Sequence, residues 1–189
     1  MPNADTFGIE PIAQLLREWC KPGMVIVDPF ARNSKVGTLR NDLNPETSAE
    51  FHMDATGFLQ YLVDRGDRAD VCLFDPPYSP RQVIEVYQAV GRKMGMEDAQ
   101  GGTMFSTPIA LMDKLLVPGG IAIRFGWNSI GFGKPYERLV TMLVCHGGAH
   151  NDTIVTVDRK SMQSEMFGGP TQSESGGMGK DNRRSTNGE

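Results

Sequence analysis

The stretch CLFDPPYSP, residues 72–80, ends an apolar run with an acid, two prolines and an aromatic ring. Asp75 supplies a carboxylate that accepts hydrogen bonds. Pro76 and Pro77 hold φ near about −65° and carry no N–H, so the Pro76 carbonyl is rigid and meets no competing donor there. Tyr78 adds a ring face on which a planar group can stack. The stretch therefore predicts a site in which the Asp75 carboxylate and the Pro76 carbonyl accept hydrogen bonds from an amine. A rigid turn that closes a strand would use the same residues.

The segments around this stretch alternate between helices and strands. Apolar side chains at helical spacing predict helices at 9–20, 54–66, 80–94 and 106–120, the last one capped by Ser106 or Thr107. Buried apolar runs predict strands at 24–30 and 71–75, and further strands are predicted at 38–45, ending before Pro45, at 121–127, at 153–159 and within 136–145. We expect an α/β fold with a mainly parallel sheet, helices on both faces, and one antiparallel strand near the C-terminus.

Polar and aromatic residues gather at the predicted carboxyl ends of the strands, where ligands bind in such sheets. Asp28, Asp42, Asp75 and Trp127 fall at or just past strand ends, and Asp54 begins a helix on the same edge. Each has a simpler interpretation: Asp28 and Asp42 as strand-end caps, Asp54 as a helix N-cap, and Trp127 as a packed core residue. Both interpretations stay open from the residues alone.

Composition narrows the class of protein. The net charge of −4 argues against holding nucleic acid by general electrostatic attraction. Cys20, Cys72 and Cys145 have no metal or disulfide spacing, which favours reduced thiols in a cytoplasmic protein. No apolar run approaches the ~20 residues of a membrane span, and no signal peptide is evident. We expect one domain at 1–160 and a disordered tail at 161–189, which is rich in Gly and Ser.

Taken together, the segments resemble the S-adenosylmethionine-dependent amino methyltransferases that modify exocyclic nitrogens of DNA bases. Asp75-Pro-Pro-Tyr matches the family hallmark, and DPFARNS from Asp28 resembles the cofactor motif. FGIEPIAQLL, NDLNP and HMDA resemble the segments that hold the methionine end, the ribose hydroxyls and the adenine amino group of the cofactor. The matches follow the family's cofactor-first order and span residue 7 to about residue 159.

The resemblance implies a Rossmann-like class I methyltransferase fold, S-adenosyl-L-methionine as cofactor and DNA as partner, without a metal or a membrane. Aspartate at position 75 favours adenine-N6 in this family, and the compact chain suits a phage-type enzyme in the host cytoplasm. The resemblance assigns the cofactor to Phe7, Pro11, Asp28, Pro29, Phe30, Asp42, Asn44, Asp54 and Ala55. It assigns catalysis to Asp75, Pro76, Pro77 and Tyr78. For substrate binding we expect Tyr78, Ser79 and Arg81, together with Trp127 and Asn128, which follow a strand beside the site. Residues such as Phe7, Pro11 and Phe30 are more often simply part of the core.

Two departures from the family pattern stand out. Residues 31–34 are Ala-Arg-Asn-Ser where the family has glycines, and Gly37 comes late. Residues 31–37 are also too few for a crossover helix between parallel strands. Either an open loop replaces that helix or the strand boundaries differ. In addition, no segment is large enough for a target-recognition region, so we expect low or short sequence specificity, or recognition shared with a second subunit.

Three other functions remain open at this point. Cytosine-N4 methylation needs the same two acceptors. An RNA or protein-amide methyltransferase has the same fold, although the amide-modifying relatives usually carry Asn in place of Asp75. An inactive S-adenosylmethionine-binding module would account for the altered glycine motif. A monomer and a homodimer are both compatible with the sequence.

Overall fold

The computed structural model describes residues 6–77, 84, 88, 91, 105–147 and 152–162. Of the predicted helix at 80–94, three isolated residues are described, and two of them, Ile84 and Gln88, are helical. Tyr78, Ser79 and Arg81, the predicted loop at 95–104 and the tail beyond residue 162 lie outside the described residues.

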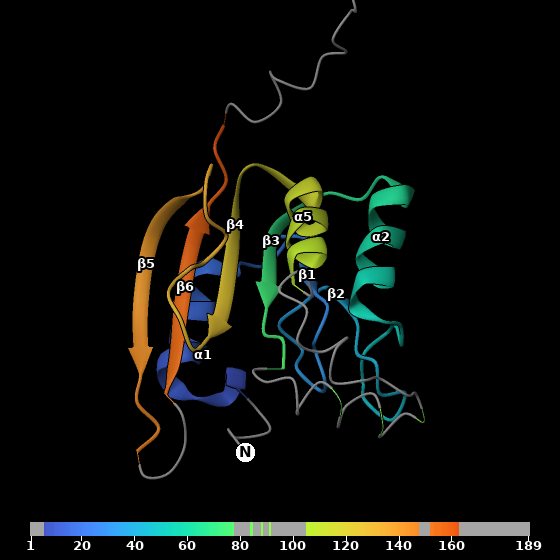
Figure 1. Ribbon diagram of the computed structural model, residues 1–189, viewed down its shortest axis with the longest axis horizontal. Coiled ribbons are helices and arrows are strands. Elements are labelled where there is room, and N and C mark those ends of the chain that lie inside the picture. The colour runs from blue at the N-terminus through green and yellow to red at the C-terminus, as the bar shows by residue number, and fades with distance from the viewer. Residues whose placement is uncertain are drawn as a thin grey trace, which may run out of the picture.

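Six strands form one sheet in the order β2-β1-β3-β4-β6-β5 (Figure 1). They are β1 (Ile26–Asp28), β2 (Leu39–Arg40), β3 (Ala69–Phe74), β4 (Leu116–Gly126), β5 (Glu137–Val144) and β6 (Thr153–Arg159). The β1–β2, β1–β3 and β3–β4 pairs are parallel, whereas β6 is antiparallel to both of its neighbours. The predicted Rossmann-like α/β sheet with one antiparallel strand near the C-terminus is confirmed. Because the strand order reverses at β1, the carboxyl ends of β1 and β3 flank the point where such sheets bind ligands.

Helices cover both faces of this sheet. They are α1 (Glu10–Trp19), preceded by the 3-10 turn η1 (Thr6–Gly8), and α2 (Ala55–Arg65) and α5 (Ser106–Leu115). α1 lies on one face, and α2 and α5 lie on the other (Figure 1). Alternate residues of β3 divide accordingly: Val71 and Leu73 pack with α1. Cys72 and Phe74 pack with α2 and α5, as a strand buried on both faces requires.

Several predicted boundaries differ from the structure. β1 and β2 are shorter than the runs at 24–30 and 38–45, and α5 ends at Leu115 rather than at residue 120. Lys160 explains the early end of α5, because its ammonium donates to the carbonyls of Asp113 and Leu116 at the last turn. Backbone bonds between Lys160 and the glycines after Leu116 then draw residues 119 and 120 into the sheet. The predicted N-cap of α5 is also wrong, since Phe105 occupies that position and makes no side-chain cap bond.

Two connections run without a helix. Residues 29–38 join β1 to β2 as an open loop, which confirms the first of the two alternatives for that short segment. Residues 127–136 likewise join β4 to β5 without a helix, and Phe132 and Tyr136 from this segment pack in the cluster with α2 and α5.

In the ranges that the structure describes, no helix is long and apolar enough to cross a bilayer. No group of three or more His, Cys, Asp or Glu side chains there is placed to hold a metal ion.

Candidate active site

Three carboxyl groups converge at the carboxyl edge of the sheet, one after each of three neighbouring strands. Asp28 ends β1, Asp42 follows β2 and Asp75 follows β3. Asp28 is completely buried. Its Oδ1 accepts the N–H of Phe30 at 3.1 Å, whereas its buried Oδ2 has no hydrogen-bond partner within the described part of the chain. Burial, reinforced by the charges of Asp75 and Asp42, raises the pKa of Asp28 to about 8. At neutral pH the free protein therefore holds a neutral acid here.

The loop after β1 is held by backbone bonds to Asp42. The two carboxylate oxygens of Asp42 accept the N–H groups of Arg32, at 3.0 Å, and Asn44, at 2.9 Å. Arg32 has a φ of 50°, a left-handed conformation that glycine adopts more easily. Gly37 is tightly packed, because a Cβ at that position would come within 2.8 Å of the Asp28 Cβ. In this chain the backbone approaches the buried Asp28 most closely at Gly37, near the end of the loop, and glycine is required there. The family pattern has its glycines at the start of the loop.

Asn41 is a structural residue of the site that the sequence interpretation missed. It is completely buried and directly follows β2, an edge strand of the sheet. Its Nδ2 donates to the carbonyls of Pro29 and Met53 at 3.1 and 3.0 Å, and its Oδ1 accepts the N–H of Met53 at 2.9 Å. These bonds tie the β1 loop to the segment that leads into α2. The available signal was an asparagine within the predicted second strand at 38–45, because an amide that becomes buried has to find partners.

A cavity of about 510 Å³ opens between η1, the β1 loop and the end of β3. Phe7 from η1, Phe30 from the loop and Asp75 line it, together with the exposed cations Arg32 and Lys35. Phe7 also packs on Phe125, with ring centroids 5.0 Å apart, so one wall is anchored in the core. The cavity thus combines aromatic walls, two cationic side chains and a carboxylate, with the buried Asp28 adjacent to Phe30.

Other predicted cofactor residues serve the framework around this cavity. Pro11 is exposed in the first turn of α1, and Pro29 is buried and accepts from Asn41. Asn44 forms a turn, with its Oδ1 accepting the N–H of Glu46. Asp54 is the N-cap of α2, where it accepts from Thr56 and Gly57, so the cap interpretation is confirmed. Ala55 is the first residue of that helix. None of these predicted residues lines the cavity.

The substrate side of the predicted site is partly described. Pro76 is buried and Pro77 half-buried directly after Asp75, whereas Tyr78, Ser79 and Arg81 lie outside the described residues. Trp127 is 69% exposed, so the interpretation of this side chain as packed core is wrong. Asn128 uses its Oδ1 to accept the N–H of Ile130 at 3.2 Å, which shapes the loop after β4.

No family model matches the chain, and no curated protein matches it. Solved structures that resemble it include TrmN from Thermus thermophilus, with 16% identity and a TM-score of 0.46 over 79% of this chain and 48% of TrmN. They also include the N-methyltransferase NodS from Bradyrhizobium japonicum WM9 in complex with S-adenosyl-L-homocysteine. That match has 12% identity and a TM-score of 0.37 over 64% of each chain. The chain spans less than half the length of TrmN. Both likenesses have low sequence identity and low TM-scores.

Proposed function

We propose that this chain is an S-adenosylmethionine-dependent methyltransferase that acts on the exocyclic amino group of adenine, N6, in DNA. One observation carries the proposal: the acid of the Asp-Pro-Pro-Tyr stretch lines the same cavity as Phe7 and Phe30. An acceptor for an amine and a pocket for a methyl donor are therefore neighbours at the switch point of the sheet.

The residues around the cavity fit the cofactor. S-adenosylmethionine supplies a methyl group on a positively charged sulfur, beside an ammonium and a carboxylate. Asp28 offers a buried oxygen with no partner in the described chain, and a nearby cation would favour its ionised form. Arg32 and Lys35 offer cations to a carboxylate, and Phe7 and Phe30 offer apolar walls. Asp42 retains acceptor capacity for ribose hydroxyls, because each of its oxygens can accept a second bond.

The chain's contribution to the chemistry is to orient a poor nucleophile. The lone pair of an aromatic amine is delocalised into its ring, and acceptors on both of its hydrogens draw that lone pair toward the methyl carbon. Asp75 provides one acceptor and the carbonyl of Pro76 the other, fixed by two prolines in succession. Placing such groups in advance is a large part of catalysis. After transfer the nitrogen carries an excess proton, and the Asp75 carboxylate is positioned to accept it.

The test is to incubate the protein with methyl-labelled S-adenosylmethionine and DNA, RNA or protein, and to analyse digested nucleosides by mass spectrometry. We expect label in DNA as N6-methyladenine. Label as N4-methylcytosine, or in RNA or protein alone, would contradict the substrate, and absence of cofactor binding at millimolar concentration would contradict the enzyme class.

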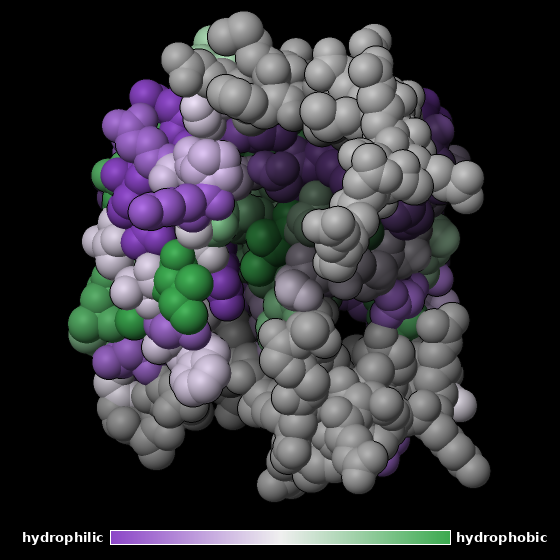
Figure 2. All heavy atoms as spheres, turned by 45° about the horizontal axis from the view of Figure 1, so that its top comes forward, coloured by the Kyte–Doolittle hydropathy of each residue, from purple (hydrophilic) through white to green (hydrophobic). Residues whose placement is uncertain are grey.

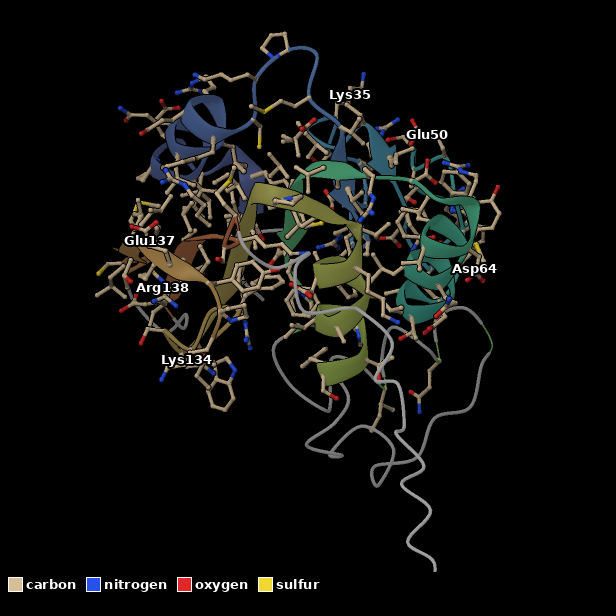
Figure 3. All side chains as sticks on the ribbon, turned by 90° about the horizontal axis from the view of Figure 1, so that it is seen from above. Lys35, Glu50, Asp64, Lys134, Glu137 and Arg138 are labelled. Atoms are coloured by element: carbon tan, nitrogen blue, oxygen red, sulfur yellow. The ribbon has the colours of Figure 1, made fainter. Side chains whose placement is uncertain are left out.

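The acceptor role is tested with Asp75→Ala, for which we expect a loss of roughly 10²- to 10³-fold or more in turnover with little change in cofactor affinity. Asp64→Ala is the matched control, because Asp64 is an exposed acid on α2 that lies away from the cavity (Figure 3). Normal turnover by the Asp75 variant would show that the acceptor pair is assigned incorrectly.

A further inference from the structure

Two large apolar side chains protrude from the loop that follows β4. Trp127 is 69% exposed and Ile130, three residues later, is 67% exposed. They lie at the start of the connection 127–136, which has no helix and runs back toward the first residue of β5. On the β5 side of the molecule, Figure 2 shows isolated hydrophobic side chains standing among hydrophilic ones. Exposing an indole and an isoleucine three residues apart on one loop is unfavourable unless something covers them.

The backbone between and after these two side chains is fixed by charged groups of the sheet. Arg124 in β4 donates to the carbonyl of Gly131 at 3.0 Å. Arg138 in β5 donates to the carbonyls of Ser129 and Ile130 at 3.0 and 3.2 Å. Figure 3 shows Arg138 with Lys134 and Glu137 at one end of the molecule, opposite Glu50 and Asp64.

A buried acid completes this anchorage. Asp158 in β6 accepts the N–H of Phe132 at 2.9 Å and is ion-paired with Arg138. Gly131 packs on this ion pair with a φ of 63°, and a Cβ there would overlap both the Arg138 guanidinium and the Asp158 carboxylate. The loop is therefore held in one shape, with its two apolar side chains directed outward.

The position of the loop relates it to the proposed active site. β3 and β4 are parallel neighbours in which Phe74 pairs with Arg124. Pro77 is three residues beyond Phe74, and Trp127 is three residues beyond Arg124. Since parallel strands lie about 4.8 Å apart, the chain segments carrying Pro77 and Trp127 leave the same edge of the sheet side by side.

We propose that Trp127 and Ile130 form a preformed ledge on which the nucleobase next to the target adenine stacks; this rests on the proposed function. The ledge is too small for a protein partner, because a stable protein interface buries about 800 Å² per side and two side chains supply only a fraction of that. A nucleobase matches an indole in size and flatness, and base–aromatic stacking tolerates every base. One cation of the loop supports the same occupant, because Lys134 is exposed. A rigid ledge also reduces the ordering cost of binding.

The chain has two tryptophans, so Trp19→Phe leaves Trp127 as the only indole emitter. Trp19 packs against the core cluster on the α1 face, whereas Phe132 and Tyr136 of the loop pack in the cluster on the other face, so its replacement by Phe does not remove a contact of the loop in either cluster. In this background we expect a single-stranded DNA nonamer with one central adenine to quench the fluorescence saturably. The same nonamer with abasic positions on both sides of the adenine should quench far less.

Trp127→Ala should weaken nonamer binding by about 5- to 150-fold, the range that one stacked base supplies, and Trp127→Phe should retain most of the affinity. The loss should appear as a higher KM for DNA. Leu143→Ala is the control for loss of an exposed apolar side chain, because Leu143 is 59% exposed on β5, outside the loop, and it should bind DNA as the wild type does. Gly131→Ala should reduce affinity by displacing the ledge, whereas Gly133→Ala, also at positive φ but with open space around it, should not.

The outcomes separate the two proposals. Methyl transfer to DNA with unchanged nonamer affinity in Trp127→Ala, or without quenching of Trp127, would overturn the ledge and leave the proposed function standing. Quenching by an RNA nonamer but not by DNA would overturn both as stated. Loss of affinity in Trp127→Ala and Gly131→Ala, with both controls unaffected, supports the ledge.

Discussion

Replacing Asp28 by Asn tests the electrostatics of the proposed active site without touching its shape. The substitution exchanges a buried carboxyl group for a neutral amide of nearly the same size, at a position that is completely buried. In the wild type, burial and the charges of Asp75 and Asp42 move the pKa of Asp28 from 3.8 to about 8. Between these two values the folded chain keeps a proton that the unfolded chain releases.

The sign and the size of the effect follow from this difference. Because the native state binds more protons from pH 4 to 8, the contribution of Asp28 to stability is present at low pH and is lost as the pH rises toward 8. Each pH unit in that window lowers the free energy of unfolding by about 1.4 kcal/mol, so the wild type loses about 3 kcal/mol between pH 5 and 7 through this group. Asp28→Asn lacks this dependence, and its stability relative to wild type should rise by the same amount.

Urea unfolding of both proteins at pH 5, 6, 7 and 8 measures this difference. At each pH the free energy of unfolding of the wild type is subtracted from that of the variant. This difference cancels the titration of all groups that the two proteins share. The exposed Asp64→Asn provides the control, for which we expect a difference near zero at every pH. A difference between Asp28→Asn and wild type that stays constant from pH 5 to 8 would refute the reasoning, because it would mean that Asp28 titrates with an ordinary pKa.

Two further predictions concern the same pocket. Gly37→Ala should lower the stability by about 1–3 kcal/mol, since its Cβ would come within 2.8 Å of the Asp28 Cβ. Gly57→Ala on α2, where a Cβ has room, should raise it by up to about 1 kcal/mol; thermal unfolding measures both, and equal shifts would contradict the packing argument. S-adenosylmethionine affinity should increase between pH 6 and 8, because a cation beside Asp28 favours its ionised form. Calorimetry in buffers of different ionisation enthalpy should detect a released proton, and Asp28→Asn should abolish both effects; an affinity independent of pH in wild type would argue against contact with this acid.

Much of the architecture could be predicted from the sequence because it depends on local patterns. Buried apolar runs located the strands, and the short spacing between the first two of them indicated a connection without a helix. Asp28 and Asp75 could be placed at one edge of the sheet since parallel strands share their carboxyl ends. These features need no knowledge of distant contacts.

The remaining features depend on partners far away in the sequence. The end of α5 is set by Lys160, which is 44 residues from Leu116, whose carbonyl it binds. The backbone of the loop after Trp127 is fixed by Arg138 and Asp158, which are distant in sequence, and no local pattern distinguishes this exposed tryptophan from a packed one. The role of Asn41 depends on Met53, on a separate segment of the chain.

The connection from β4 to β5 limits which insertions and substitutions this chain can accept during evolution. Its anchors come from three different strands, so lengthening it would break the bonds that Arg124, Arg138 and Asp158 make to its backbone. New preferences would then arise by exchanging the outward side chains at 127 and 130 one at a time, with the backbone kept as it is. Directed evolution on those two positions alone is a compact library for altering what the protein accepts.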